Sequence, residues 1–295
     1  MKIISTCSFK GGCGKSTIAA NLAYLLAKSG KKVCILDSDA SHPSLHLLLG
    51  PSSKNLTPTF SDYILDNQTD PDCIIHDISS SFGLQPSSLS IIPSRLDSKT
   101  INNLIKNHKF DYQRIRELSD EVRRQGTDIL IIDTTPELDS IVRMQLLLSN
   151  LILLFTRIDE VDIWGTIETI DLPLPSDLLI VFNNVNLPSV KAQSGGEEGL
   201  RKELIAAWDT VRKGPGISYK IFQQYPQAVL KDKIRPSDMP GDVRSVSIFP
   251  YPIPHSQDLQ FFHARDNKDL FVRVYPKDPT AQTLSLFAAD INLFG

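Results

Sequence analysis

Residues 2–17 decide the fold, and they read Lys2-Ile3-Ile4-Ser5-Thr6-Cys7-Ser8-Phe9-Lys10-Gly11-Gly12-Cys13-Gly14-Lys15-Ser16-Thr17. A short apolar run leads into a glycine-rich turn, and the turn leads into the start of a helix. This order is typical of a phosphate-binding loop. The common pattern G-x-x-x-x-G-K-[ST] would need glycine at position 9, where Phe9 stands. The variant K-G-G-x-G-K-[ST] fits instead, and it adds a second lysine, Lys10, at the front of the loop.

Each residue type in this loop has a physical reason to bind phosphate. Glycine backbones adopt positive φ values and approach phosphate oxygens closely. The helix that follows offers free N–H groups and a partial positive charge. Lys15 is expected to reach the β- and γ-phosphates, Ser16 to ligate Mg²⁺, and Thr17 to donate to the α-phosphate. The predicted nucleotide-binding residues of the loop are Lys10, Gly11, Gly12, Cys13, Gly14, Lys15, Ser16 and Thr17.

Composition indicates an ordinary globular protein rather than a membrane or disordered one. The chain has 295 residues, of which 41% are hydrophobic and 22% charged. No apolar stretch approaches the length of a membrane span, and the N-terminus lacks the pattern of a signal peptide. The four cysteines form no C-x-x-C pair, and two lie in predicted strands, which predicts buried thiols in a reducing compartment. We therefore expect a cytoplasmic protein.

The periodicity of the chain predicts strands alternating with helices. A helix is expected over 15–29, capped by Gly30, followed by a continuous apolar strand over 33–36. Further strands are expected over 73–78, 89–92, 128–133, 151–155, 178–182 and 246–249. Further helices are expected over 43–49, 60–65, 100–107, 111–124, 138–148, 197–213 and 280–293. This alternation predicts an α/β fold, a doubly wound, mostly parallel sheet with helices on both faces. We expect one domain over 1–295, with an insertion at about 185–244.

Polar residues follow several predicted strands at their carboxyl ends. They are Asp37, Asp39, Asp133 and Asn183. Ligands of open parallel sheets bind at that edge, where the phosphate loop also lies. Asp133 closes a four-residue apolar run, which indicates a carboxylate that holds Mg²⁺ through water, although it could also cap the following loop. Asp37 or Asp39 could likewise cap the helix expected over 43–49.

These motifs together resemble the ParA/MinD family of P-loop ATPases, the group with a deviant Walker A loop. Asp37-x-Asp39 resembles the second-strand motif of the family, and Asp133-Thr134-Thr135-Pro136 resembles its switch II, with Thr135 in place of a proline. Asn183 matches an asparagine that contacts adenine. The segment Phe249-Pro250-Tyr251 matches one that packs near the base, so Pro250 is a further nucleotide-binding candidate. The motifs that carry this resemblance span residues 2–251.

The resemblance implies roles for the site residues. Lys10, Lys15 and Asp39 are the catalytic candidates, with Asp39 positioning the attacking water, while Ser16, Asp37 and Asp133 serve Mg²⁺. Lys10 is implied to cross a dimer interface to the phosphates of a second copy, which would tie ATP binding to dimerisation. A solvated lysine beside a polyanion is the simpler alternative. Cys13 could make the loop redox-sensitive, although a plain small side chain explains it as well.

The resemblance implies a cytoplasmic ATPase that uses ATP and Mg²⁺ as a dimerisation switch, with slow, partner-stimulated hydrolysis. Such switches position cargo, in partitioning, in cell division or at a surface or secretion machine. A P-loop metabolic enzyme related to dethiobiotin synthetase is the alternative class. An iron–sulfur carrier would need paired cysteines after the switch region, and no cysteine follows Cys73.

The sequence leaves the partner open. Residues 185–244 hold ten basic and seven acidic residues, which is weak support for binding DNA non-specifically. The C-terminal helix has no Lys or Arg after Lys277, so autonomous membrane anchoring is disfavoured. An activating protein partner is expected.

Overall fold

The computed structural model describes residues 1–39, 42–50, 56–66, 68–94, 112–136, 140–157, 160–170, 174–185, 246–249, 251–262 and 269–293. The predicted helix over 100–107, the amphipathic helix over 197–213 and most of the expected insertion lie outside the described residues. So does Pro250. The single-domain boundary therefore stays a prediction.

The described chain forms an eight-stranded sheet in the order β3-β4-β2-β5-β1-β6-β7-β8. Every neighbouring pair is parallel except the short edge strand β3, which runs antiparallel to β4. The strands are β1 (Lys2–Cys7), β2 (Val33–Asp37), β3 (His76–Asp77), β4 (Leu89–Ile92), β5 (Ile129–Asp133), β6 (Leu151–Thr156), β7 (Asp177–Phe182) and β8 (Val246–Ile248). The predicted doubly wound, mostly parallel α/β fold is confirmed.

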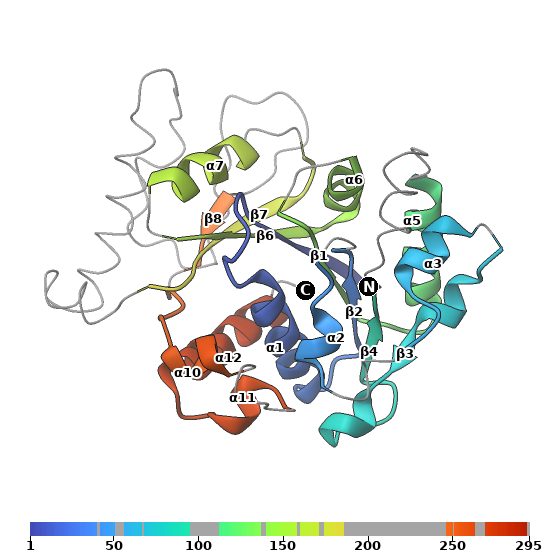
Figure 1. Ribbon diagram of the computed structural model, residues 1–295, viewed down its shortest axis with the longest axis horizontal. Coiled ribbons are helices and arrows are strands. Elements are labelled where there is room, and N and C mark those ends of the chain that lie inside the picture. Colours follow the sequence, from blue (N-terminus) through green and yellow to red (C-terminus); the bar gives the residue numbers. More distant parts are fainter. Residues whose placement is uncertain are drawn as a thin grey trace, which may run out of the picture.

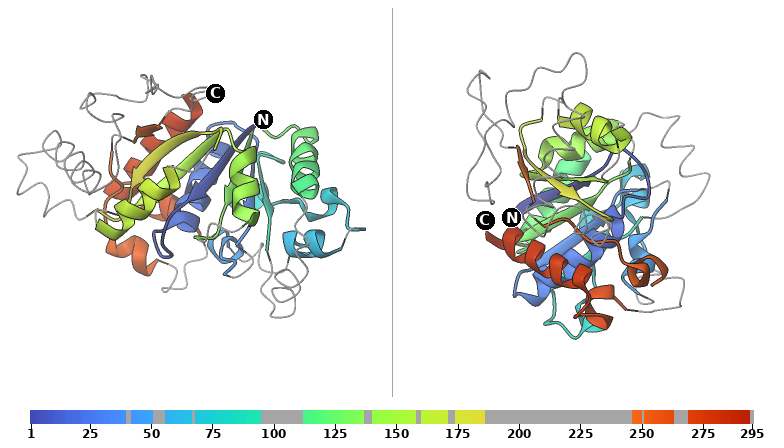
Figure 2. Two further views of the ribbon diagram at one scale, coloured as in Figure 1. Left: turned by 90° about the horizontal axis from the view of Figure 1, so that it is seen from above. Right: turned by 90° about the vertical axis from the view of Figure 1, so that its left-hand side faces the viewer.

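Helices cover both faces of this sheet (Figures 1 and 2). One face carries α1 (Lys15–Lys28), α10 (Gln257–Phe261), α11 (Phe271–Val274) and α12 (Pro279–Leu293), and the other carries α5 (Tyr112–Arg124), α6 (Ser140–Leu148) and α7 (Glu160–Ile170). The short helices are α2 (Leu45–Leu48) and α3 (Phe60–Leu65), with 3₁₀ turns at Pro71–Ile74 and Ser79–Phe82. Among the described residues, none of the helices has the length and apolar character that a membrane crossing requires.

Strand β2 shows why the central strands are apolar throughout. Val33 and Ile35 belong to the core beneath α1 and α12, whereas Cys34 and Leu36 belong to the core beneath α3 and α5. Alternate side chains of a strand point to opposite faces, so a strand covered on both sides needs apolar residues at every position. All five residues of β2 are buried, up to Asp37 at the carboxyl edge of the sheet.

Two expectations need correction. The strand predicted over 73–78 is reduced to His76–Asp77, because Asp70 caps a 3₁₀ turn that begins at Pro71 and includes Cys73. The periodicity also gave no helix after β6, where α7 lies, and none at α10 or α11. By contrast, α3 has the predicted bounds, closed by a capping box between Thr59 and Asp62.

Candidate functional site

The phosphate loop joins β1 to α1 at the carboxyl edge of the sheet. Gly14 is the N-cap of α1 and has φ 79°, in the left-handed region that glycine adopts without strain. No side chain caps this helix, and its first turn carries no acidic residue. The N–H groups at its start and the positive end of its dipole therefore face the loop, as the motif predicts.

Lys15 is held inside the loop. The residue is 7% exposed, and its Nζ donates a hydrogen bond to the Ser8 hydroxyl at 2.9 Å. The same Ser8 hydroxyl donates to the carbonyl oxygen of Lys10 at 2.7 Å. Ser8 thus ties both lysines of the motif into one loop conformation, a role that the sequence pattern did not indicate.

The predicted aspartates meet at this edge because of strand register. Asp37 lies opposite Asp133 in the β2–β5 pair, and Thr6 lies opposite Asp133 in the β1–β5 pair. Both carboxylates are fully buried. Burial and the neighbouring charge of Asp133 raise the pKa of Asp37 well above its usual value. The structure thus brings together two of the acids that the sequence singled out.

One carboxylate oxygen of Asp133 has no hydrogen-bond partner among the described residues. Thr6 donates to its Oδ1 at 2.9 Å, while its buried Oδ2 has no hydrogen-bond partner. Burial raises its pKa to about 6, against hydrogen bonds from Ser16 and Thr6 that lower it. An ionised, buried and half-satisfied carboxylate beside Ser16 fits a Mg²⁺ ion, which prefers oxygen ligands and keeps several waters. The described residues contain no cluster of three His, Cys, Asp or Glu side chains that could hold a metal ion.

Asp37 is also a helix cap. Its Oδ2 accepts from the backbone N–H groups of Ser44 and Leu45 at 3.0 Å each, at the start of α2. Its Oδ1 accepts from the backbone N–H of Asp39 at 3.2 Å. The capping alternative for Asp37 therefore holds in this structure, and its support of Mg²⁺ stays a prediction. Asp39 is partly exposed, and its Oδ1 accepts from the N–H of His42 at 2.8 Å.

Lys10 does not point freely into solvent. Its Nζ lies 3.2 Å from Oδ1 of Asp162 on α7, and Arg157 Nε donates to Oδ2 of the same carboxylate at 2.6 Å. Burial acts to raise the pKa of Asp162, but hydrogen bonds from Arg157 and Lys10 outweigh it and lower that pKa. Sequence reasoning missed Asp162. The sequence did hold a signal, because the polar residues Asp162, Thr166 and Thr169 recur at the spacing of one helix face. The structure shows that this polar face is buried.

Two further contacts fix the loop against its surroundings. The ring of Phe9 lies so close to Gly165 of α7 that a Cβ there would come 1.8 Å from Phe9 Cγ. On the other side, Asn183 donates through Nδ2 to the carbonyl oxygen of Cys13 at 2.5 Å. Cys13 itself is buried, and burial together with the charge of Asp162 raises its pKa. This environment favours the plain structural interpretation of Cys13 over a redox role.

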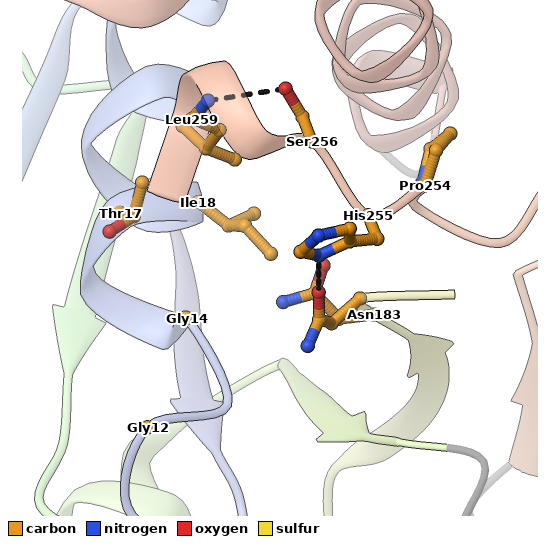
Figure 3. A pocket seen from close by; sticks show the side chains of 10 residues that line it. Gly12, Gly14, Thr17, Ile18, Asn183, Pro254, His255, Ser256 and Leu259 are labelled. Atoms are coloured by element: carbon orange, nitrogen blue, oxygen red, sulfur yellow. Dashed lines mark hydrogen bonds between the residues drawn. The ribbon is translucent and has the colours of Figure 1, made fainter. Parts of the chain in front are cut away.

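A cavity of about 270 Å³ opens beside the loop (Figure 3). It is lined by Gly12, Gly14, Thr17, Ile18, Asn183, Asn184, Pro254, His255, Ser256 and Leu259. The predicted adenine contact Asn183 lies in this wall, although its contact with a base stays a prediction. Of the remaining loop candidates, Ser16 hydrogen-bonds to the carboxylate of Asp133, and a Cβ on Gly11 would lie 3.9 Å from Cγ of Pro136. Pro250 falls outside the described residues.

A glycine-rich loop between a buried strand and a helix, with Lys15 and Asp133 at its sides, defines a P-loop nucleotide-binding protein. The family model described as "AAA domain" matches residues 1–172, which is more than half of the chain. The chain belongs to this family, and its K-G-G-x-G-K-S loop and its fold identify it as one of the ParA/MinD ATPases.

Curated relatives match only part of the chain. An ATP-binding protein of Methanocaldococcus jannaschii is 32% identical over 48% of this chain and 55% of its own length. The septum site-determining protein MinD of Thermotoga maritima is 29% identical over 47% of this chain and 54% of its own. The iron–sulfur cluster carrier protein of Escherichia coli is 50% identical, but over 20% of this chain and 16% of its own. The chain thus spans about half, or less, of the length of these relatives.

Solved structures match along the whole chain. The cell division ATPase MinD of Pyrococcus furiosus superposes with a TM-score of 0.64 at 17% identity, covering 100% of this chain and 99% of its own. The McdA–ATP complex of Cyanothece superposes with a TM-score of 0.65 at 17% identity, covering 99% and 96%. Identities this low show a shared fold, and the predicted fold is confirmed on that basis.

Proposed function

We propose that this protein is an ATP-dependent dimerisation switch that hydrolyses ATP slowly and positions a cellular cargo. The observation that carries the proposal is the convergence of the variant phosphate loop with Asp37, Asp39 and Asp133 at one edge of the sheet. Phosphoryl transfer needs positioned donors and charge neutralisation rather than covalent help from the protein. This edge supplies both.

The site residues have distinct parts in the proposed reaction. Lys15 and the N–H groups at the start of α1 would bind the β- and γ-phosphates, while Ser16 and Oδ2 of Asp133 would hold Mg²⁺. A metal ion held there would supply neutralisation of the charge that develops on the phosphate oxygens. Asp39 orients the attacking water, and its partly exposed position at the rim of the site supports that role.

Lys10 links nucleotide binding to a second copy of the chain. In the single chain it contacts Asp162, and we propose that it leaves this carboxylate to reach the phosphates bound by a partner copy. Arg157 stays on Asp162 at 2.6 Å, so the buried acid keeps a counter-charge when Lys10 moves away. That arrangement lowers the cost of the exchange, because a buried carboxylate without a partner is strongly destabilising.

The cargo and the activating partner are proposed from the roles for which similar proteins are named. The Thermotoga relative is named for septum placement and the Pseudomonas aeruginosa relative FleN is named an antiactivator, so similar chains carry different roles. We propose a cytoplasmic positioning factor with a protein activator, and non-specific DNA as one candidate matrix. We do not propose iron–sulfur cluster transfer from the short match to an iron–sulfur carrier, because no cysteine follows Cys73.

Light scattering of the wild type and of Asp39→Ala, each with ADP and with ATP, tests the switch. We expect monomers with ADP, and a stable dimer of Asp39→Ala with ATP. Lys10→Ala is the matched control, which should bind nucleotide but stay monomeric. An Asp39→Ala protein that stays monomeric at saturating ATP would contradict the switch. Co-sedimentation of the ATP dimer with DNA and with liposomes then separates a DNA matrix from a protein anchor.

A further inference from the structure

The cavity beside the phosphate loop has the composition of a ring-binding pocket. Ile18, Pro254 and Leu259 supply apolar walls, and the polar side chains on it come mainly from two chain segments, 183–184 and 255–256. Ligand pockets are typically apolar, with a few placed polar groups that fix orientation, and span roughly 300 to 1,000 Å³. The cavity of about 270 Å³ is close to the lower end of that range.

Backbone pairing fixes the two polar segments side by side. Val185 and Pro254 form a parallel bridge, in which the N–H of Val185 donates to Ile253 at 3.1 Å and the N–H of His255 donates to Val185 at 2.8 Å. Asn184 has φ 61°, a left-handed conformation that asparagine tolerates better than most residues. The side chain of Asn184 therefore meets the imidazole of His255 at the cavity wall.

The contact between Asn184 and His255 selects one tautomer of the imidazole. Asn184 Oδ1 lies 2.6 Å from His255 Nδ1. The side-chain oxygen of Asn184 accepts hydrogen bonds and cannot donate, so this contact is a hydrogen bond in the tautomer whose Nδ1 carries the proton. In the neutral ring the other nitrogen, Nε2, then bears a lone pair and acts as an acceptor. In this tautomer His255 adds an acceptor nitrogen to the residues that line the cavity.

We propose that His255 determines the choice of nucleobase by accepting a hydrogen bond from the exocyclic amino group of adenine. This inference rests on the proposed function, because it concerns the same nucleotide site. An amino group at the six-position of a purine can donate to Nε2, whereas the carbonyl oxygen at that position in guanine or hypoxanthine cannot. Asn184 is a positioning residue that acts through the tautomer of His255, and Asn183 holds the loop edge of the same cavity through Cys13.

Diphosphates are suitable probes because they separate base recognition from dimerisation. Calorimetric titration with Mg²⁺ compares ADP, IDP and purine riboside diphosphate, which carries hydrogen in place of the amino group. A neutral hydrogen bond corresponds to roughly a three- to tenfold preference for ADP over purine riboside diphosphate in the wild type. We expect IDP to bind more weakly still, because two acceptors then face each other.

Variants at the two residues test the assignment. His255 is exposed, so its replacement should leave the fold intact. His255→Ala should bind ADP and purine riboside diphosphate equally, while His255→Gln, which keeps an acceptor oxygen, should retain part of the preference. Asn184→Gly keeps the left-handed backbone and removes the oxygen that fixes the tautomer, so its preference should be intermediate. Unchanged thermal midpoints would exclude a merely structural effect.

The outcomes separate failure of this inference from failure of the proposed function. A wild type that binds none of the three diphosphates would overturn both. A wild type that binds ADP tightly, with His255→Ala keeping the full preference over purine riboside diphosphate, would overturn the assignment of His255 alone. The same holds if His255→Ala weakens all three diphosphates by one common factor, because that pattern indicates a contact to ribose rather than to the base.

Discussion

Lys10 Nζ lies 3.2 Å from Oδ1 of Asp162, and this contact joins the front of the phosphate loop to helix α7. Asp162 is almost fully buried, whereas the Lys10 side chain is 38% exposed and can exchange this partner for another. Arg157 holds the second oxygen of the carboxylate. The charge that is proposed to act in the dimer is thus engaged within the single chain.

Replacing Asp162 should therefore favour the dimer. In Asp162→Asn the lysine no longer has to leave a carboxylate, and a partly exposed ion pair contributes up to about 1 kcal/mol. We expect ATP-dependent dimerisation at roughly two- to fivefold lower protein concentration, measured by light scattering. Asp162→Asn combined with Lys10→Ala is the control and should stay monomeric. Weaker dimerisation of Asp162→Asn than of the wild type would contradict this account of the contact.

Phe9 and Gly165 form a second contact between the loop and α7. Substitutions at these two residues should therefore have strongly non-additive effects on the free energy of unfolding. The Cβ of Gly165→Ala would overlap the Phe9 ring, so we expect a loss of about 1–3 kcal/mol in the free energy of unfolding. In the Phe9→Ala background the same change removes a helical glycine without a clash, and a gain of up to about 1 kcal/mol is expected. Urea unfolding of the four proteins in this double-mutant cycle measures the coupling. Additive effects would show that the ring does not lie on Gly165 in solution.

The four cysteines should differ sharply in reactivity. Cys7, Cys13 and Cys34 are buried, and Cys73 is exposed. Burial raises the pKa of Cys7 and Cys34 to about 12, and burial and Asp162 raise the pKa of Cys13. At pH 8 a thiol-exchange reagent should therefore modify one thiol rapidly and the other three only after unfolding. Cys73→Ser should abolish the rapid phase, and a second rapid thiol would indicate that Cys13 reaches solvent.

Cys34 should make the protein sensitive to alkaline pH. Burial alone raises the pKa of its thiol from 9.0 to about 12. The folded state then holds a proton that the unfolded chain releases, so the stabilisation is complete below pH 9 and is lost as pH rises toward 12. In this window the wild type should lose about 1.4 kcal/mol per pH unit relative to Cys34→Ala. Urea unfolding at several pH values gives both slopes, and parallel slopes would show that Cys34 ionises normally.

Sequence alone predicted the parts of this protein that depend on local chemistry. The phosphate loop follows from its glycines and lysines, which act over a few residues. The helix expected over 60–65 has its predicted bounds as α3, and the structure shows that a capping box closes it. Strand β2 follows from an unbroken apolar run. The placement of Asp37 and Asp133 at one edge followed from the rule that parallel strands end together. The predicted strand over 73–78 failed because Asp70 and Pro71 favour a 3₁₀ turn there.

Tertiary structure decided the contacts between residues far apart in sequence. Asp162 contacts Cys13, which is 149 residues away in sequence, and Asn184 contacts His255, which is 71 residues away. No sequence pattern specifies a partner over separations of this length. Only the packing of α7 against the loop showed that Lys10 is engaged, and only the Val185–Pro254 bridge showed that Asn184 lies beside His255. Periodicity and motifs encode the strand edges and the loop, whereas charge partners and proton positions depend on which surfaces the fold brings together.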